Sequence, residues 1–168
     1  MLNLRGEADA QLIDAVRTVC GCELPFAANA SSVGRDGEIL KLGPNEWLLI
    51  ADPATAWSET MTIAGATLTD VSHARVAVRV DGDKSRDMLA KGCAVDLHPR
   101  AFPAGACIQT SIAKIGVILH RQPNANGFTA YAARSFAGSF WHWLTAAAAE
   151  YGYDVTAAQR GSIPLRHS

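Results

Sequence analysis

The sequence predicts an α+β fold in which antiparallel sheets are flanked by helices. The chain has 168 residues, of which 49% are apolar, enough for the core of one compact domain or of two small halves. Alternating apolar runs are joined by short turns, as in β-hairpins, and segments of helical periodicity lie between them. Short links of this kind favour antiparallel pairing with helices on one face of the sheet.

The first half is expected to contain two helices and a hairpin. Residues 7–20 carry an apolar stripe at helical spacing, and Gly21 is a natural stop. Small and turn-forming residues predict a loop at 22–37. Two apolar runs flank a turn at 43–46, and a second helix is predicted between Pro53, which suits a first helical turn, and Gly65.

The second half begins at about residue 67. Val76, Val78 and Val80 alternate and predict a half-buried strand. A short helix is predicted from an N-cap at Asp83 to Lys91, followed by a loop at 94–106 that contains two prolines. Alternating runs then predict strands between residues 106 and 121 and after the Asn126–Gly127 turn.

The last helix is predicted to start near Ser135 and to end at Gly152. Its apolar face comprises Phe136, Phe140, Trp143, Leu144, Ala147 and Tyr151. The predicted organisation is a single domain over residues 1–168, or two halves at about 1–66 and 67–154 with a tail at 155–168.

Four polar residues precede the first predicted strand of the second half: Asp70, Ser72, His73 and Arg75. Neighbours along a strand point to opposite faces, so Ser72 and His73 are poorly placed to share a hydrogen bond. No G-x-S-x-G elbow is present. We therefore predict no catalytic residue here, and expect Asp70 and Ser72 to bind backbone groups at the entry to the strand.

Charge and composition weigh against several classes of protein. The net charge is −1 with a pI of about 6.5 and no basic stripe, so nucleic-acid binding is not expected. No apolar run approaches the roughly 20 residues of a membrane span, and Glu7 and Asp9 occupy the place of a signal peptide's apolar region. A cytoplasmic location is expected. The C-x-C pair at Cys20 and Cys22 lacks the spacing of a zinc site, and the cysteines are expected to be buried apolar residues.

Two regions are candidates for contact with another protein. The loop Asp96–Phe102 carries His98, Arg100 and Phe102, and could bind an anion, a planar ligand or, as we prefer, a partner. Trp141 lies off the apolar face of the last helix, where it is either an exposed interface anchor or part of a helix buried on both sides.

A family resemblance rests on four stretches in their order and spacing: LGPNEWLLIAD, TDVSHARVAVRVDG, DKSRDMLAKGCAVDLHPRAFPAGACIQTSIAKIGVILHR and GFTAYAARSFAGSFWHWLTAAAAEYG. Over residues 38–154 these resemble the gamma subunit of heterotetrameric sarcosine oxidase. That subunit is in turn similar to the folate-binding fold of the aminomethyltransferase, or glycine-cleavage T-protein.

The resemblance implies a structural, non-catalytic subunit in an assembly with alpha, beta and delta subunits. In that family the assembly oxidises sarcosine to glycine, forms hydrogen peroxide and can pass the one-carbon unit to tetrahydrofolate. FAD, FMN and NAD are implied on the alpha and beta subunits and zinc on delta, with no cofactor on gamma. His73 and Arg75 are then candidates to face a partner, or else a neighbouring loop of the same domain, and the isolated chain is expected to be able to self-associate.

Two alternatives follow from the same resemblance. In the T-protein family an Asn-Asp-Val stretch supplies an aspartate that contacts folate. Here Asp96 aligns with that aspartate, while Val95 replaces the asparagine. The chain could therefore be a free-standing tetrahydrofolate-binding protein that acts through Asp96, or the gamma-type subunit of a related N-methyl amino acid dehydrogenase.

Overall fold

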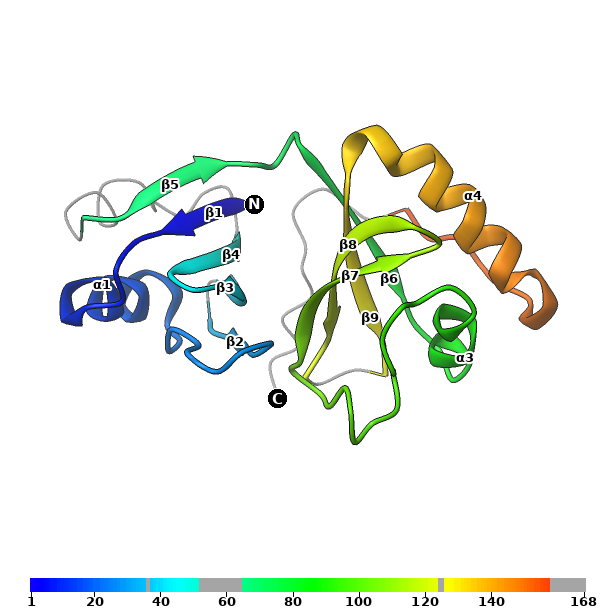
Figure 1. Ribbon diagram of the computed structural model, residues 1–168, viewed down its shortest axis with the longest axis horizontal. Coiled ribbons are helices and arrows are strands. Elements are labelled where there is room, and N and C mark those ends of the chain that lie inside the picture. The colour runs from blue at the N-terminus through cyan, green and yellow to red at the C-terminus, as the bar shows by residue number, and fades with distance from the viewer. Residues whose placement is uncertain (36, 52–64, 124–125, 158–168) are drawn as a thin grey trace.

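The computed structural model describes residues 1–35, 37–51, 65–123 and 126–157. Two sheets pack against each other at the centre, and helices cover their outer faces (Figure 1). The strand pairs among the described residues are all antiparallel, which confirms the predicted α+β class. The chain passes from the first sheet to the second between Asp70 and Arg75.

The first sheet has the strand order β2-β3-β4-β1-β5. Helix α1 (Ala10–Cys20) covers its outer face, begins where the Asp9 side chain accepts a hydrogen bond from Leu12 N, and ends at Gly21 with φ 65°. The strands are β1 (Leu2–Arg5), β2 (Ser31–Val33), β3 (Gly37–Gly43), β4 (Glu46–Ala51) and β5 (Thr67–Asp70).

The second sheet has the strand order β6-β9-β8-β7, and helices α3 and α4 pack on its outer face (Figure 1). The strands are β6 (Arg75–Val80), β7 (Cys107–Ile112), β8 (Ile115–Arg121) and β9 (Phe128–Ala133). The helices are α3 (Ser85–Ala90) and α4 (Ala137–Ala148), and 3-10 turns η1 (Arg134–Phe136) and η2 (Ala149–Tyr151) flank α4.

Three apolar clusters hold these layers together. One lies between α1 and the first sheet, and another between the second sheet and its two helices. The third lies between the sheets and joins the two halves of the chain. Its buried members are Leu40, Leu48, Ile50, Cys107, Ile118 and Tyr131.

The hairpins and the alternating strands were predicted correctly, but several shorter elements were not. Strand β2 lies inside the predicted loop 22–37, because it is held by pairing with β3 and not by a pattern of its own. Asp83 is not an N-cap: the cap of α3 is Lys84, without a side-chain bond. The predicted helix from Pro53 lies outside the described residues except for its end at Gly65.

The ends of the last helix also differ from the prediction. Phe140 and Leu144 are buried as expected, but Phe136 is 51% exposed and Tyr151 is 38% exposed. Both lie in the 3-10 turns that flank α4, where the chain has left the helical path over the sheet. Within the described ranges, no helix is both long and apolar enough to cross a membrane.

Candidate functional site

The polar cluster before β6 forms a structural turn. Ser72 and His73 lie in the turn that joins the two sheets, not on a strand, so the strand-alternation argument does not apply to them. The Ser72 hydroxyl bonds the amino group and the carbonyl of Met1, and Ser72 N donates to Asp70 Oδ1 at 2.8 Å. These bonds confirm that Asp70 and Ser72 serve the backbone, while His73 is exposed and Arg75 is partly buried.

The loop at 94–106 is closed by its own hydrogen bonds. His98 N donates to Asp96 Oδ1 at 2.8 Å, and Phe102 N donates to the His98 carbonyl. His98 and Arg100 are exposed, as a partner-facing loop requires. Phe102 is not available at the surface: it is 4% exposed, and its ring stacks on Phe128 at a centroid distance of 6.2 Å.

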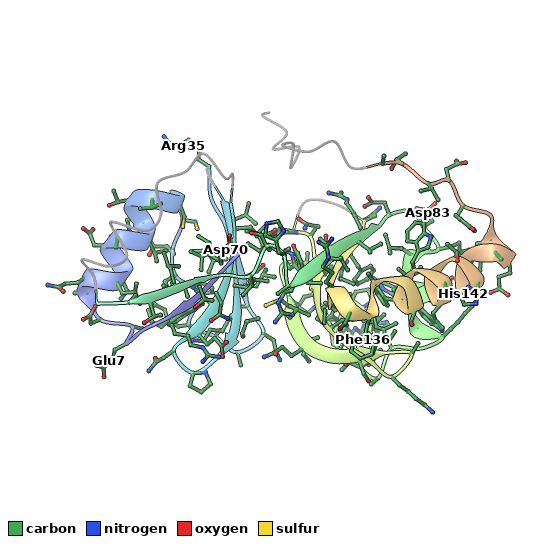
Figure 2. The ribbon with its side chains drawn as sticks, turned by 90° about the horizontal axis from the view of Figure 1, so that it is seen from above. Glu7, Arg35, Asp70, Asp83, Phe136 and His142 are labelled. Carbon is green, nitrogen blue, oxygen red and sulfur yellow. The ribbon has the colours of Figure 1, made fainter. Side chains whose placement is uncertain are left out.

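Helix α4 lies on the outside of the second half, where His142 is exposed on the helix and Phe136 is exposed in the 3-10 turn before it (Figure 2). Trp141 is 43% exposed, which favours the exposed position over burial on both sides. Trp143 packs inward over Gly92, where an added Cβ would lie 2.4 Å from the indole ring. The helix therefore has one exposed tryptophan, Trp141, and two packed aromatic side chains, Phe140 and Trp143.

The inner face of the second sheet consists of three rows of side chains that run across its strands. Because side chains alternate along a strand, residues two apart share a face. The strand register gives a polar row with His120 at its centre, an apolar row with Ile118 and a row of small side chains with Gly116. The first sheet covers the polar and the apolar rows.

The polar row contains a buried chain of three groups, Ser31, His120 and Glu38. Ser31 Oγ lies 2.9 Å from His120 Nε2, and His120 Nδ1 lies 3.1 Å from Glu38 Oε1. His120 is 0% exposed and Glu38 is 6% exposed. Glu38 Oε1 has no other hydrogen-bond partner among the described residues.

The hydrogen bonds define where the protons of this chain lie. Ser31 Oγ donates to the Gly105 carbonyl at 2.7 Å, so its oxygen accepts from His120 Nε2–H. The other ring nitrogen of a neutral imidazole is then an acceptor and faces the Glu38 carboxyl. Two acceptors at 3.1 Å require a proton between them, and a protonated Glu38 supplies it.

Burial gives both ionisable groups pKa values that agree with this assignment. It raises the pKa of Glu38 to about 7, against the smaller opposing effects of the Gln122 hydrogen bond and the Arg79 charge. It lowers the pKa of His120 to about 4, so that the ring is neutral at pH 7. Gln122 Nε2 also lies near this pair, 3.4 Å from His120 Nδ1 and 3.2 Å from Thr129 Oγ1.

The order Ser, His, Glu is that of a hydrolase triad, but the chemistry differs. The Ser31 proton is directed to a carbonyl and not to the ring, so His120 does not activate the hydroxyl. A histidine with a pKa of about 4 is a weak general base at neutral pH. The chain of groups is suited to joining β2, β3 and β8 across the two sheets.

The row of small side chains forms the floor of an open groove of about 540 Å³. The register pairs Ser111 with Gly116 and Arg75 with Ala133. A Cβ added at Gly116 would meet no atom within 4 Å, so the space above it is open. The residues that line the groove are Arg75, Ala94, Gln109, Thr110, Ser111, Gly116, Val117 and Ile118.

The cysteines are thiols within or beside the apolar clusters. Cys20, Cys22 and Cys107 are buried, and Cys93 is partly buried. A hydrogen bond with Cys20 lowers the pKa of Cys22 to about 7. Among the described residues, no three His, Cys, Asp or Glu side chains gather closely enough to hold a metal ion.

Of the residues that line the groove, Arg75 was predicted from the sequence as a candidate site residue, whereas Ser31, His120 and Glu38 were not. Ser31 and His120 are 89 positions apart and come from different sheets, so no local motif marks them. One signal was present: His120 ends the apolar run of β8 at a position that alternation assigns to the same face as Ile118.

Comparison with known proteins identifies the protein family that the chain resembles. Residues 5–150 match the sarcosine oxidase, gamma subunit family. Sarcosine oxidase subunit gamma from Corynebacterium sp. (strain U-96) is 33% identical over 143 residues, which cover 82% of this chain and 69% of that protein. The corresponding subunit from Corynebacterium sp. (strain P-1) is 33% identical over 148 residues, covering 85% and 72%.

The fold agrees with a solved structure of the same kind. A chain of the heterotetrameric sarcosine oxidase from Corynebacterium sp. U-96, in complex with pyrrole 2-carboxylate, superposes with a TM-score of 0.80 at 30% identity. The match covers 93% of this chain and 82% of that one. The chain described here therefore belongs to the sarcosine oxidase gamma subunit family.

Proposed function

We propose that this chain is a non-catalytic structural subunit of a heterotetrameric sarcosine oxidase, assembled with alpha, beta and delta subunits. Membership of the gamma subunit family and the likeness to a chain of a heterotetrameric enzyme support this role. The observation that carries the proposal is that serine, histidine and glutamate side chains, which are common catalytic groups, have structural roles in this chain. Ser31, His120 and Glu38 join the two sheets, and Ser72 holds the first strand at Met1.

The reaction of the proposed assembly is the oxidative demethylation of sarcosine to glycine, with hydrogen peroxide formed and the one-carbon unit passed to tetrahydrofolate. In this proposal the other subunits hold FAD, FMN, NAD and zinc. The gamma chain supplies a rigid body of two halves, in a fold of the T-protein folate-binding type, and works in the cytoplasm. The buried seam between its sheets supports such a role, because a junction of packed apolar side chains and hydrogen-bonded polar groups resists relative motion of the halves.

Several exposed groups are proposed to contact the other subunits. His98 and Arg100 project from a loop that its buried residue Phe102 anchors, so the loop is rigid before it binds. Trp141 offers an apolar surface on α4, a residue type that is enriched at interface hot spots. His73 lies in the exposed turn between the sheets.

Co-expression with the other three subunits tests the proposal. With the tag on the alpha subunit, we expect this chain to co-purify in a fixed ratio, and we expect the assembly prepared without it to lose activity or stability. An assembly that forms and reaches full activity and thermal stability without this chain would show the proposal to be wrong.

The identity of the amine substrate is a finer part of the proposal. A gamma-type subunit of an N-methyl amino acid dehydrogenase would assemble in a similar way, because the substrate pocket lies on another subunit in either case. Turnover of the purified assembly on sarcosine and on other N-methyl amino acids, measured with and without oxygen as the acceptor, separates the two.

A further inference from the structure

We propose that the open groove on the inner face of the second sheet holds an extended segment of another subunit, whose Asp or Glu carboxylate pairs with Arg75. This inference rests on the proposed function, since it requires a partner chain. It adds a docking site and the chemistry of its occupant.

The shape of the groove follows from the strand register. Its floor is the row in which Ser111 is paired with Gly116, next to the pair Arg75 and Ala133. Small side chains leave the sheet backbone accessible, and no atom lies within 4 Å of a Cβ built on Gly116. The neighbouring row, with Ile118 and Tyr131, is filled by the first sheet, so the groove begins where that cover ends.

Arg75 gives the groove its charge. The side chain lines the groove and is partly buried, and among the described residues no hydrogen bond or ion pair engages its guanidinium. Hydrogen bonds from Asn3 and Arg5 to Glu46 Oε1, each at 2.9 Å, lower the pKa of Glu46, and the more distant Arg75 charge adds only the smallest effect. An unpaired, partly desolvated guanidinium favours a carboxylate, which it can bind with two parallel hydrogen bonds.

The form of the groove indicates a segment of chain as its occupant. Small-molecule sites usually enclose most of their ligand, whereas this groove of about 540 Å³ is open. The side chains of Gln109, Ser111 and Ile118 share the inner face of the sheet, and these residues line the groove. Polar and apolar groups along one channel suit a peptide backbone with alternating side chains.

Two substitutions test the proposal by different means, in the complete assembly purified through the alpha subunit. Arg75→Glu reverses the charge, and Gly116→Leu fills the groove from a position where the added side chain meets open space. We expect each to weaken binding of this chain to the assembly at least tenfold. Gly116→Ala should have a smaller effect, because it adds a single methyl group.

The controls separate docking from folding. Arg17→Glu makes the same change of charge on α1, where Arg17 forms an exposed ion pair with Glu23, and should bind as wild type does. Thermal unfolding of each full-length variant alone should match wild type within a few degrees. If Arg75→Glu unfolds early, it is replaced by Arg75→Gln, which removes the charge without reversing it. If Gly116→Leu unfolds early, Gly116→Ala takes its place, with a smaller loss of binding expected.

The outcomes distinguish this inference from the proposed function. If wild type does not assemble, both are wrong. If wild type assembles, and Arg75→Glu and Gly116→Leu bind the assembly as tightly as wild type does, the proposed docking site alone is wrong. If the isolated chain forms a dimer that Arg75→Glu and Gly116→Leu dissociate, while their binding to the assembly is unchanged, the occupant is a second copy and the inference is also wrong.

Discussion

Glu38→Gln is predicted to stabilise the chain at alkaline pH and to lose that advantage at acidic pH. The carboxyl is 6% exposed and faces the bare Nδ1 of His120 at 3.1 Å. Glutamine has the same shape, carries no charge at any pH, and can donate an amide N–H to that nitrogen. The substitution therefore removes one titration and retains the hydrogen bond.

The magnitude follows from the pKa of Glu38, which burial raises from 4.5 to about 7. Because the folded chain holds the proton more tightly than the unfolded chain, the stabilisation is complete below pH 4.5 and is lost as the pH rises through about 7. A shift of this size corresponds to about 3 kcal/mol, at about 1.4 kcal/mol per pH unit. The difference in the free energy of unfolding, Glu38→Gln minus wild type, should therefore increase by about 3 kcal/mol from pH 4.5 to pH 8.

His120 shapes the wild-type curve but does not alter this difference, because both proteins contain it. Its pKa falls from 6.5 to about 4 in the folded chain, so its contribution is present above pH 6.5 and is lost as the pH falls towards 4. Between pH 4.5 and 6.5 the two groups oppose each other. Wild type should therefore show a flat stability maximum in this range.

Urea unfolding of the full chain at half-unit steps from pH 4.5 to 8 measures the difference. Glu46→Gln is the matched control: hydrogen bonds with Asn3 and Arg5 lower the pKa of Glu46 from 4.5, so its contribution changes only below that pH, and the difference from wild type should stay nearly constant over the measured range. A difference between Glu38→Gln and wild type that does not change with pH would refute the reasoning. A difference that moves in favour of wild type as the pH rises would show that Glu38 is ionised in the folded chain.

The remaining predictions concern the loop at 94–106. Phe102→Ala should lower the free energy of unfolding by about 3–5 kcal/mol, because it removes a buried ring that stacks on Phe128. Phe136→Ala, at a site that is 51% exposed, should lower it by less than about 1 kcal/mol. Chemical denaturation measures both values, and equal losses would contradict the argument from burial. The second prediction is that the isolated chain does not bind tetrahydrofolate, because Asp96 Oδ1 already accepts a hydrogen bond from His98 N within the loop. Calorimetry should then show no binding heat at high micromolar ligand. Binding that Asp96→Ala abolishes would instead favour the folate-binding alternative.

The parts of the fold that were predictable carry their own periodic pattern. The strands β6, β7 and β8 have alternating sequences, and the alternating valines of β6 pack partly buried against the second sheet's core, as expected. Strand β8 is buried on both faces from Val117 to His120, because the first sheet covers its inner side. The hairpin of β3 and β4 is marked by its turn, in which Asn45 adopts φ 52°. In these segments the local pattern and the tertiary structure agree, which is why the sequence alone was sufficient.

The elements that were missed depend on partners far away in the chain. Strand β1 has four residues and is stabilised by lying between β4 and β5, and β2 has three. Three or four residues are too few for an alternating pattern to identify a strand from the sequence. Phe102 was predicted to contact a partner because it shares a loop with His98 and Arg100, but its ring is buried against Phe128 in the core of the second half.

The inner face of the second sheet shows why the candidate site was only partly predictable. Strand alternation alone places Gly116, Ile118 and His120 on one side of β8. What each position does depends on the first sheet, which covers His120 with Glu38 and Ile118 with apolar side chains, and leaves Gly116 open. The same strand therefore carries a buried link between the halves at one end and an accessible floor at the other. Substitutions at His120 should act on folding, whereas those at Gly116 should act on assembly.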